Sequence, residues 1–211
     1  MIKNLFLGLV LLVFALATMQ FAAGQTDVGL NAYGAFNGIG STTVNYYAEY
    51  FHPANAAGGM LEVRHIHSPW VGFEATYSLN RANQRYAYLT FGPVPHSGFG
   101  SGLFSVSAFA HEIAGDWIVT NHLTKSLRLF ALAGAGVQIT VPSGGPSYTQ
   151  SSATAVYIYG AGVDWQGFRH FGLRAQYRGD IHKAPQIDTQ FPPLNSFIHT
   201  AEPMVGVYYR F

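Results

Sequence analysis

The sequence predicts an all-β protein, an eight-stranded antiparallel up-and-down transmembrane β-barrel. Three observations predict this fold: an apolar leader, eight later segments in which apolar and polar side chains alternate, and charged side chains that share one face of those segments. Alternation with a period of two residues is typical of a strand, because successive side chains point to opposite faces of a sheet.

The first 24 residues have the layout of a secretory signal peptide. Lys3 gives a positive start, residues 5–17 are an unbroken apolar run, and residues 22–24 are small. A transmembrane helix needs roughly 20 apolar residues, and this run has only 13. We therefore expect residues 1–24 to be a signal peptide and residues 25–211 to form one barrel domain.

The composition favours a chain that is surrounded by something apolar. Charged residues make up 10% of the chain, aromatic residues make up 15%, and there are 24 glycines. An ordinary soluble domain has about a quarter charged residues. The absence of cysteine excludes disulfides and thiolate metal sites. The formal net charge of +1 gives no basic surface for nucleic acid.

Eight segments alternate in the manner of strands. In residues 170–182, Leu173 and Tyr177 fall on one face while Arg174 and Arg178 fall on the other. The segments that we expect to be strands are Asp27–Asn37, Gly58–His67, Pro69–Asn80, Gly102–Asn121, Ser126–Val141, Ala153–Gln166, His170–His182 and Thr200–Phe211.

Short and long connections alternate along the chain. The short ones lie near Ser68 and at residues 122–125 and 167–169, and the longer ones at 38–57, 81–101, 142–152 and 183–199. In an up-and-down barrel this alternation places all short turns at one end and all long loops at the other. The stretches "GPVPHSGFGSG" and "VPSGGPSYTQSS" are typical of exposed loops. We hypothesise that such loops bind an extracellular ligand, and their composition does not identify it.

The distribution of charge indicates which face of the sheet points outward. One face carries aliphatic residues such as Leu173 and Val207 and almost no charge, and in hydrocarbon a Lys or Arg at the midplane costs about 2–4 kcal/mol. That face is therefore expected to meet lipid, with paired Arg and carboxylate groups inside and small residues such as Gly162 and Gly172 leaving room for the arginines. The expected lumen charge network is Glu62, Arg64, Glu74, Glu112, Asp116, Arg128, Asp164, Arg174, Arg178, Asp180, Glu202 and Arg210.

Aromatic residues are expected at both ends of the barrel. At the short-turn end they would form an interfacial girdle made of Trp70, Trp117, Trp165, Phe171, Tyr209 and Phe211. Near the long-loop end we expect Tyr46, Tyr47, Tyr50, Phe51, Phe99 and Phe104. Parity places the side chain of Trp70 in the lumen, which does not fit a girdle.

The chain ends inside a strand, with the sequence "EPMVGVYYRF". With the leader and the strand count, this ending resembles the small outer-membrane barrels of Gram-negative bacteria, the OmpA/OmpX-type membrane domain. In that family the last strand ends in Phe, with aromatic or aliphatic residues two apart, and the barrel-assembly machinery reads this signal. Val207, Tyr209 and Phe211 match it. The resemblance implies export to the bacterial outer membrane, contact with its lipids and lipopolysaccharide, and closure of the last strand against the first.

The sequence favours a monomer with no cofactor, no metal and no catalytic activity, in a structural or surface-interaction role. One alternative is a lipid-modifying enzyme of the lipid A deacylase kind, for which Ser196, His199 and Glu202 have an unsuitable spacing. A second alternative is a narrow pore for small solutes or ions, although eight strands leave an interior just wide enough for side chains. His65 and His67 share a strand face, but two ligands are too few for a zinc site.

Overall fold

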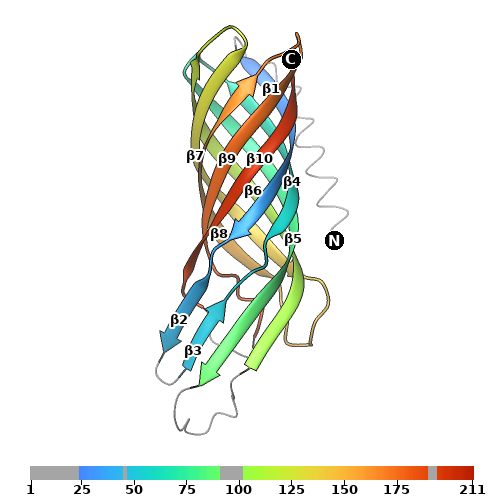
Figure 1. Cartoon of the computed structure of the whole chain (residues 1–211), viewed down its shortest axis with the longest axis vertical. Coiled ribbons are helices and arrows are strands. Elements are labelled where there is room, and N and C mark those ends of the chain that lie inside the picture. The colour runs from blue at the N-terminus through green and yellow to red at the C-terminus, as the bar shows by residue number, and fades with distance from the viewer. Residues whose placement is uncertain (1–23, 45–46, 91–101, 190–193) are drawn as a thin grey trace.

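The computed structural model describes residues 24–44, 47–90, 102–189 and 194–211, and within them the chain forms ten strands (Figure 1). In this described part, no helix is long and apolar enough to span a membrane. Most of the predicted signal peptide, residues 1–23, lies outside the described residues. The strands are β1 (Gln25–Asn37), β2 (Gly40–Val44), β3 (Tyr47–Phe51), β4 (Ala56–Ile66), β5 (Val71–Thr90), β6 (Gly102–His122), β7 (Leu127–Pro142), β8 (Ser152–Trp165), β9 (Phe171–Lys183) and β10 (Phe197–Arg210).

Eight of these strands close into a barrel. The order around it is β1, β10, β9, β8, β7, β6, β5 and β4, and every neighbouring pair is antiparallel. The last strand pairs with the first from Asp27↔Arg210 to Asn37↔Thr200, so the barrel wall has no open edge. The predicted fold class, an eight-stranded up-and-down barrel, is confirmed.

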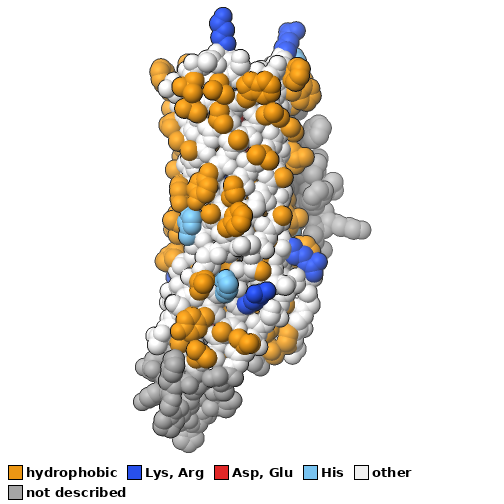
Figure 2. Space-filling model, viewed as in Figure 1, with side chains coloured by type: hydrophobic (Ala, Val, Ile, Leu, Met, Phe, Trp, Pro, Cys, Tyr) orange, Lys and Arg blue, Asp and Glu red, His pale blue; other side chains and the backbone are white. Residues whose placement is uncertain are grey.

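The wall of the barrel is apolar outside and polar inside. Burial alternates along β9, where Leu173 is exposed and Arg174 is buried, and along β10, where Val205 is exposed and Glu202 is buried. Figure 2 shows hydrophobic side chains spread over the barrel wall and no acidic side chain on the face that it presents. An apolar exterior around a charged interior is the arrangement of a barrel whose outside meets hydrocarbon.

The lumen is filled by side chains. Two buried apolar clusters lie inside the wall: one of Ile66, Ala114, Ile118, Phe130, Leu132, Val156 and Ile158, and one of Tyr33, Ala35, Met60 and Met204. Gly162 and Gly172 make room for rings, not directly for arginines as the sequence suggested. A Cβ at Gly162 would strike the ring of Phe130, and a Cβ at Gly172 would strike the ring of Tyr208.

The short turns lie together at one end of the barrel, with exposed aromatic residues around them. At this end Tyr209 packs between Phe171 and Phe211, with ring centroids 5.1 Å from each. Trp117 and Trp70 are both exposed. The lumen position that parity gave Trp70 is wrong, because this residue lies in the turn before β5, where strand alternation has not yet begun.

The other end of the barrel continues as a protrusion, which we define as β2, β3, residues 81–90 of β5 and residues 102–107 of β6 (Figure 1). The strands β5 and β6 are the longest, with 20 and 21 residues, and β3 pairs with β5 beyond the barrel rim. The segments predicted as loops at 38–57 and 81–101 are therefore partly strand. Backbone hydrogen bonds to a neighbouring strand keep this part of the chain extended after it leaves the wall.

A third apolar cluster forms the core of the protrusion. It consists of Phe51, Tyr86, Tyr88, Phe104, Val106, Ala184, Ile187, Leu194 and Ile198. Phe51 and Phe104, expected near the long-loop rim, do lie at this end, but their side chains are buried in the cluster. Tyr50 is exposed, whereas Tyr46, Phe99 and the side chain of Tyr47 lie outside the described residues.

The outward orientation of Val205 can be tested by placing a charge there. Val205→Arg should lower the free energy of unfolding in lipid vesicles by about 2–4 kcal/mol, because an arginine near the middle of the wall meets hydrocarbon. Leu123, which is exposed in a short turn, provides the control, since Leu123→Arg should cost about 1 kcal/mol or less at the interface. Urea titration of both variants checks the difference, and equal losses would contradict the orientation of the wall.

Candidate functional site

The part of the lumen next to the short turns, which lie at the top of Figure 1, is called the lower lumen here and is centred on the carboxylate of Asp164. In the sheet Asp164 lies between Arg128 and Arg174, one on each neighbouring strand. The Arg174 Nε donates to Oδ1 over 2.6 Å, and the Arg128 Nη2 donates to Oδ2 over 2.6 Å. Arg64 reaches the same Oδ2 over 3.3 Å from β4, which lies on the opposite side of the barrel. One carboxylate on β8 thus joins opposite walls of the lumen.

The other members of the lower network complete these pairs. Arg64 also binds Glu74, with 2.7 Å between Nε and Oε2, and Arg174 forms an ion pair with Glu62. Arg210 and Arg128 both donate to Asp27, over 3.1 and 3.0 Å. The lower lumen therefore holds four arginines and four carboxylates in contact, and it is electrically balanced. The members are Arg64, Arg128, Arg174, Arg210, Asp27, Glu62, Glu74 and Asp164.

Two aromatic rings support the arginines. The guanidinium of Arg64 lies 4.1 Å from the ring centroid of Phe130, and that of Arg174 lies 5.0 Å from the centroid of Tyr208. A cation over an aromatic face is attracted by the ring quadrupole, most strongly where water is excluded. These are the rings that fit against Gly162 and Gly172, so the glycines position the arginines through the rings.

Asp27 belongs to this network, but sequence reasoning missed it. It lies at the start of β1, where the expected strand began, and it is fully buried. The signal that could have found it is barrel closure, because pairing the last strand with the first places Asp27 opposite Arg210.

The upper lumen, the part nearer the protrusion and toward the bottom of Figure 1, has a different charge balance. Arg178 forms an ion pair with Glu112 and lies 3.3 Å from Asp180, measured between Nε and Oδ1. Glu202 is also buried here and pairs with Arg178 in the strand register. Asp116 is fully buried between the two levels, and neither of its carboxylate oxygens has a hydrogen-bond partner. The carboxylates of Glu112, Asp180 and Glu202 here face one arginine.

Residues proposed for the assembly signal lie on the outside of the barrel, at the short-turn end. The side chains of Val207, Tyr209 and Phe211 are all exposed. The backbone N–H of Phe211 donates to the carbonyl of Thr26 over 3.0 Å, so the last residue stays paired with the first strand. The three side chains form a row on the lipid-facing side of β10 and just beyond it.

The residues considered for enzyme chemistry do not come together. His199 is exposed on the outer face of β10 and contacts Tyr159, with 2.8 Å between His199 Nε2 and the hydroxyl oxygen. Glu202 is buried in the lumen, and Ser196 Oγ accepts from the backbone N–H of Ser41 over 3.2 Å. A nucleophile, its base and a carboxylate need to be within hydrogen-bond reach of one another. His199 and Glu202 lie on opposite faces of the wall, and Ser196 lies in the segment before β10.

The two histidines considered for a metal remain a pair. The rings of His65 and His67 are 6.4 Å apart, and His65 Nδ1 lies 3.0 Å from the hydroxyl of Thr26. Among the described residues, no group of three or more His, Cys, Asp or Glu side chains is arranged to hold a metal ion.

A second, smaller group of buried acids lies where the protrusion meets the segment before β10, in stretches predicted as loops. Glu49 on β3 and Asp188 on the segment before β10 are both 3% exposed. The Tyr88 hydroxyl donates to Asp188 Oδ2 over 3.3 Å. Burial raises the pKa of Glu49 to about 7, and the nearby charge of Asp188 acts in the same direction. The Tyr88 hydroxyl thus links the protrusion to the segment around Asp188, and the buried carboxyl of Glu49 beside this link has a pKa near neutral.

Comparisons with known proteins match the shape of the chain and not its sequence. No known family model matches, and curated protein sequences give no match either. Solved structures do match. The structure of Ail from Yersinia pestis in complex with the heparin analogue sucrose octasulfate has a TM-score of 0.52 and 16% identity, over 89% of this chain and 99% of that one. The fold is that of small bacterial outer-membrane barrels.

Two further structures support the same conclusion. OprG from Pseudomonas aeruginosa has a TM-score of 0.53 and 10% identity, over 90% of this chain and 96% of that chain. Neisserial surface protein A has a TM-score of 0.51 and 14% identity, over 89% of this chain and 97% of that one. The resemblance that the sequence predicted is confirmed, and at these identities it shows the fold alone.

The lower network can be tested by removing its central charge. Asp164→Asn should lower the free energy of unfolding by about 3–5 kcal/mol, because it leaves arginines buried without their shared partner. Asp180→Asn makes the same chemical change in the upper lumen, where acids are in excess, and should cost about 1 kcal/mol or less because Arg178 keeps Glu112. Urea unfolding of both variants measures the difference, and a larger loss for Asp180→Asn would refute the assignment of the central charge.

The acids of the protrusion predict a pH dependence. A carboxyl whose pKa is raised in the folded state holds its proton more tightly there, so its contribution to stability is present in acid and declines as the pH rises from about 4.5 through about 7. Amide hydrogen exchange in the protrusion, corrected for intrinsic rates, should therefore be faster at about pH 8 than at about pH 5.5. Glu49→Gln should flatten this dependence and leave the amides of the barrel wall unchanged. A dependence that survives in Glu49→Gln would rule out Glu49 as its source.

Proposed function

We propose that this chain is a non-catalytic, monomeric barrel of the bacterial outer membrane that acts at the cell surface through its protrusion. The observation that carries the proposal is the contrast between the two ends of the molecule. The lower lumen is crossed by ion pairs, whereas the long-loop end carries a folded extension with its own apolar core. Export by a signal peptide comprising residues 1–24 belongs to the same proposal.

The closed lumen argues against the pore alternative. Solutes would have to displace Asp164 and the three arginines that contact it, and these charges are buried, with aromatic rings against Arg64 and Arg174. Breaking buried ion pairs is strongly unfavourable, because the separated charges stay in a medium of low polarity. The separation of His199 from Glu202 likewise supports a non-enzymatic barrel.

The protrusion supports a role in surface interaction. A folded extension beyond the membrane is costly to order unless its apolar core stabilises it, and here nine buried residues do so. The similar barrel Ail has been crystallised with a heparin analogue, which shows that a barrel of this fold can bind an external ligand. We place the interaction of this chain at the protrusion, where the connecting loops of such barrels face the outside. Contact with lipopolysaccharide and other outer-membrane lipids follows from the apolar wall.

The role at the surface can be tested with bacteria that display the full chain. Replacing residues 40–51 by a short Gly-Ser linker removes the β2–β3 hairpin and should reduce adhesion to cultured epithelial cells or self-aggregation. Heat-modifiable migration on gels verifies that the shortened barrel still folds. Planar bilayer recordings of the unaltered protein should show no steady conductance. Unchanged adhesion and aggregation, or regular channel openings, would contradict the proposal.

The assembly signal yields a separate prediction. Phe211→Ala combined with Tyr209→Ala should slow insertion by the barrel-assembly machinery, because both side chains lie exposed at the end of the closing strand. Spontaneous folding into detergent micelles should change little, since neither side chain packs in the lumen. Phe197→Ala alters an exposed aromatic residue at the opposite end of β10 and serves as the control. Equal slowing in the control would mean that the machinery does not read this terminus.

A further inference from the structure

The upper lumen contains a polar pocket that neither the ionic network nor the protrusion accounts for. Its volume is about 30 Å³, and it is partly open to solvent. A cavity needs roughly 10–15 Å³ to hold one water molecule, so a small ion fits here. Apolar residues of the protrusion core, Phe51 and Ile198, border it on one side. Glu112, which also lines the pocket, is ion-paired with Arg178.

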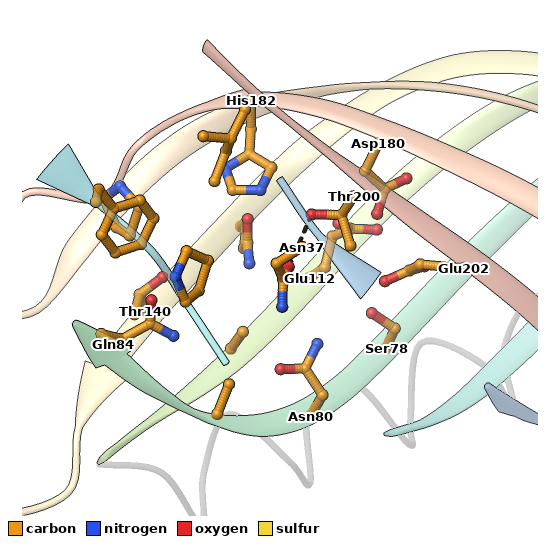
Figure 3. A pocket seen from close by; sticks show the side chains of 17 residues that line it. Asn37, Ser78, Asn80, Gln84, Glu112, Thr140, Asp180, His182, Thr200 and Glu202 are labelled. Atoms are coloured by element: carbon orange, nitrogen blue, oxygen red, sulfur yellow. Dashed lines mark hydrogen bonds between the residues drawn. The ribbon is translucent and has the colours of Figure 1, made fainter. Parts of the chain in front are cut away.

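The lining is rich in oxygen and lacks basic side chains other than one histidine. No Lys or Arg lines the pocket, and the polar groups are carboxylates, amides and hydroxyls. In Figure 3 the carboxylates of Glu112, Asp180 and Glu202 gather on one side of it, and the amides of Asn37 and Asn80 lie around the remainder. A cleft lined by one sign of charge concentrates counter-ions.

One side chain in particular indicates a missing partner. Glu202 is 3% exposed and lines the pocket; its Oε2 accepts no hydrogen bond, and its carboxylate lies beside that of Asp180. The Oε1 of Gln138, also in the lining, is likewise buried and has no hydrogen-bond partner. A buried acceptor without a donor or cation is costly. Both oxygens would be satisfied by a cation in the pocket.

From this geometry we propose that the upper lumen binds one small monovalent cation, an alkali metal ion or ammonium. The three carboxylates that line the pocket face only one arginine, Arg178, so a single positive charge reduces an excess of negative charge that the protein does not balance. The three pocket carboxylates do not form a group that would hold a metal ion through acidic side chains alone, so the amide and hydroxyl oxygens of the lining have to contribute. Such a lining suits a monovalent ion that neutral oxygens also bind. In the selectivity filters of potassium channels, carbonyl oxygens replace the hydration shell of the ion in this way.

The proposal is tested by ion exchange at constant ionic strength, because screening by salt also changes the ionic network. The full chain in micelles is titrated with sodium, potassium, rubidium or ammonium chloride in place of N-methylglucamine chloride, whose cation is too large for the pocket. At least one small cation should raise the unfolding midpoint in a saturable way, because it binds the folded state alone. Equal midpoints in all of these salts would overturn the proposal.

Matched variants locate the effect. Glu202→Gln should weaken the apparent cation affinity by about tenfold or more, since it removes a charged ligand. Glu49→Gln makes the same change outside the pocket and should preserve the cation response. A response that is equal in Glu202→Gln and in the unaltered chain would place the ion elsewhere and refute the site. If Glu202→Gln fails to fold, Asp180→Asn takes its place in the comparison.

A direct measurement separates a cation from protons. Equilibrium dialysis against rubidium should find about one bound ion per barrel in the unaltered protein, and fewer in the variant that lacks the pocket carboxylate. Stability that rises on acidification but ignores every small cation would mean that protons neutralise the acids, and the proposal would then be wrong.

Discussion

The structure depends on the pairing of charges inside a narrow closed cylinder. A barrel in hydrocarbon has to turn its apolar side chains outward, and the inward positions are then left for everything else. Charges buried there are tolerated only when partners and hydrogen bonds surround them. Asp164 meets this requirement for Arg64, Arg128 and Arg174 together. This need of buried charges for partners explains why ion pairs join opposite walls. It also explains why rings lie against the arginines and why glycines lie beside those rings.

Charge is distributed unevenly along the axis of the barrel. The lower lumen is balanced and packed, so it forms a plug whose contacts are all internal. The upper lumen has an excess of carboxylates and a pocket beside them. A balanced network stabilises the barrel and leaves little capacity to bind anything else. An unbalanced one costs stability unless something from outside completes it, and the properties of the upper lumen therefore depend on solution conditions.

Much of this fold could be predicted from the sequence, because a period of two residues fixes which side chains share a face. Parity alone separated Leu173 from Arg174, and the terminal aromatic row indicated where the barrel closes. Parity failed at Trp70, since it applies only inside a strand. It also could not find the pair of Glu49 and Asp188, because β3 and the segment before β10 are positioned by tertiary packing against β5 and not by a pattern of their own.

The same reasoning explains why the fold is shared with barrels that are only 10–16% identical. Outward apolar positions, inward small or polar positions and short turns at one end are requirements on residue class, and many sequences satisfy them. The specific contacts are not fixed in this way. Residue class alone does not dictate the contacts of Asp164 with its three arginines, the acids of the upper lumen or the core of the protrusion. The function of this chain therefore has to be sought in those contacts, and the barrel wall serves to place them in the membrane.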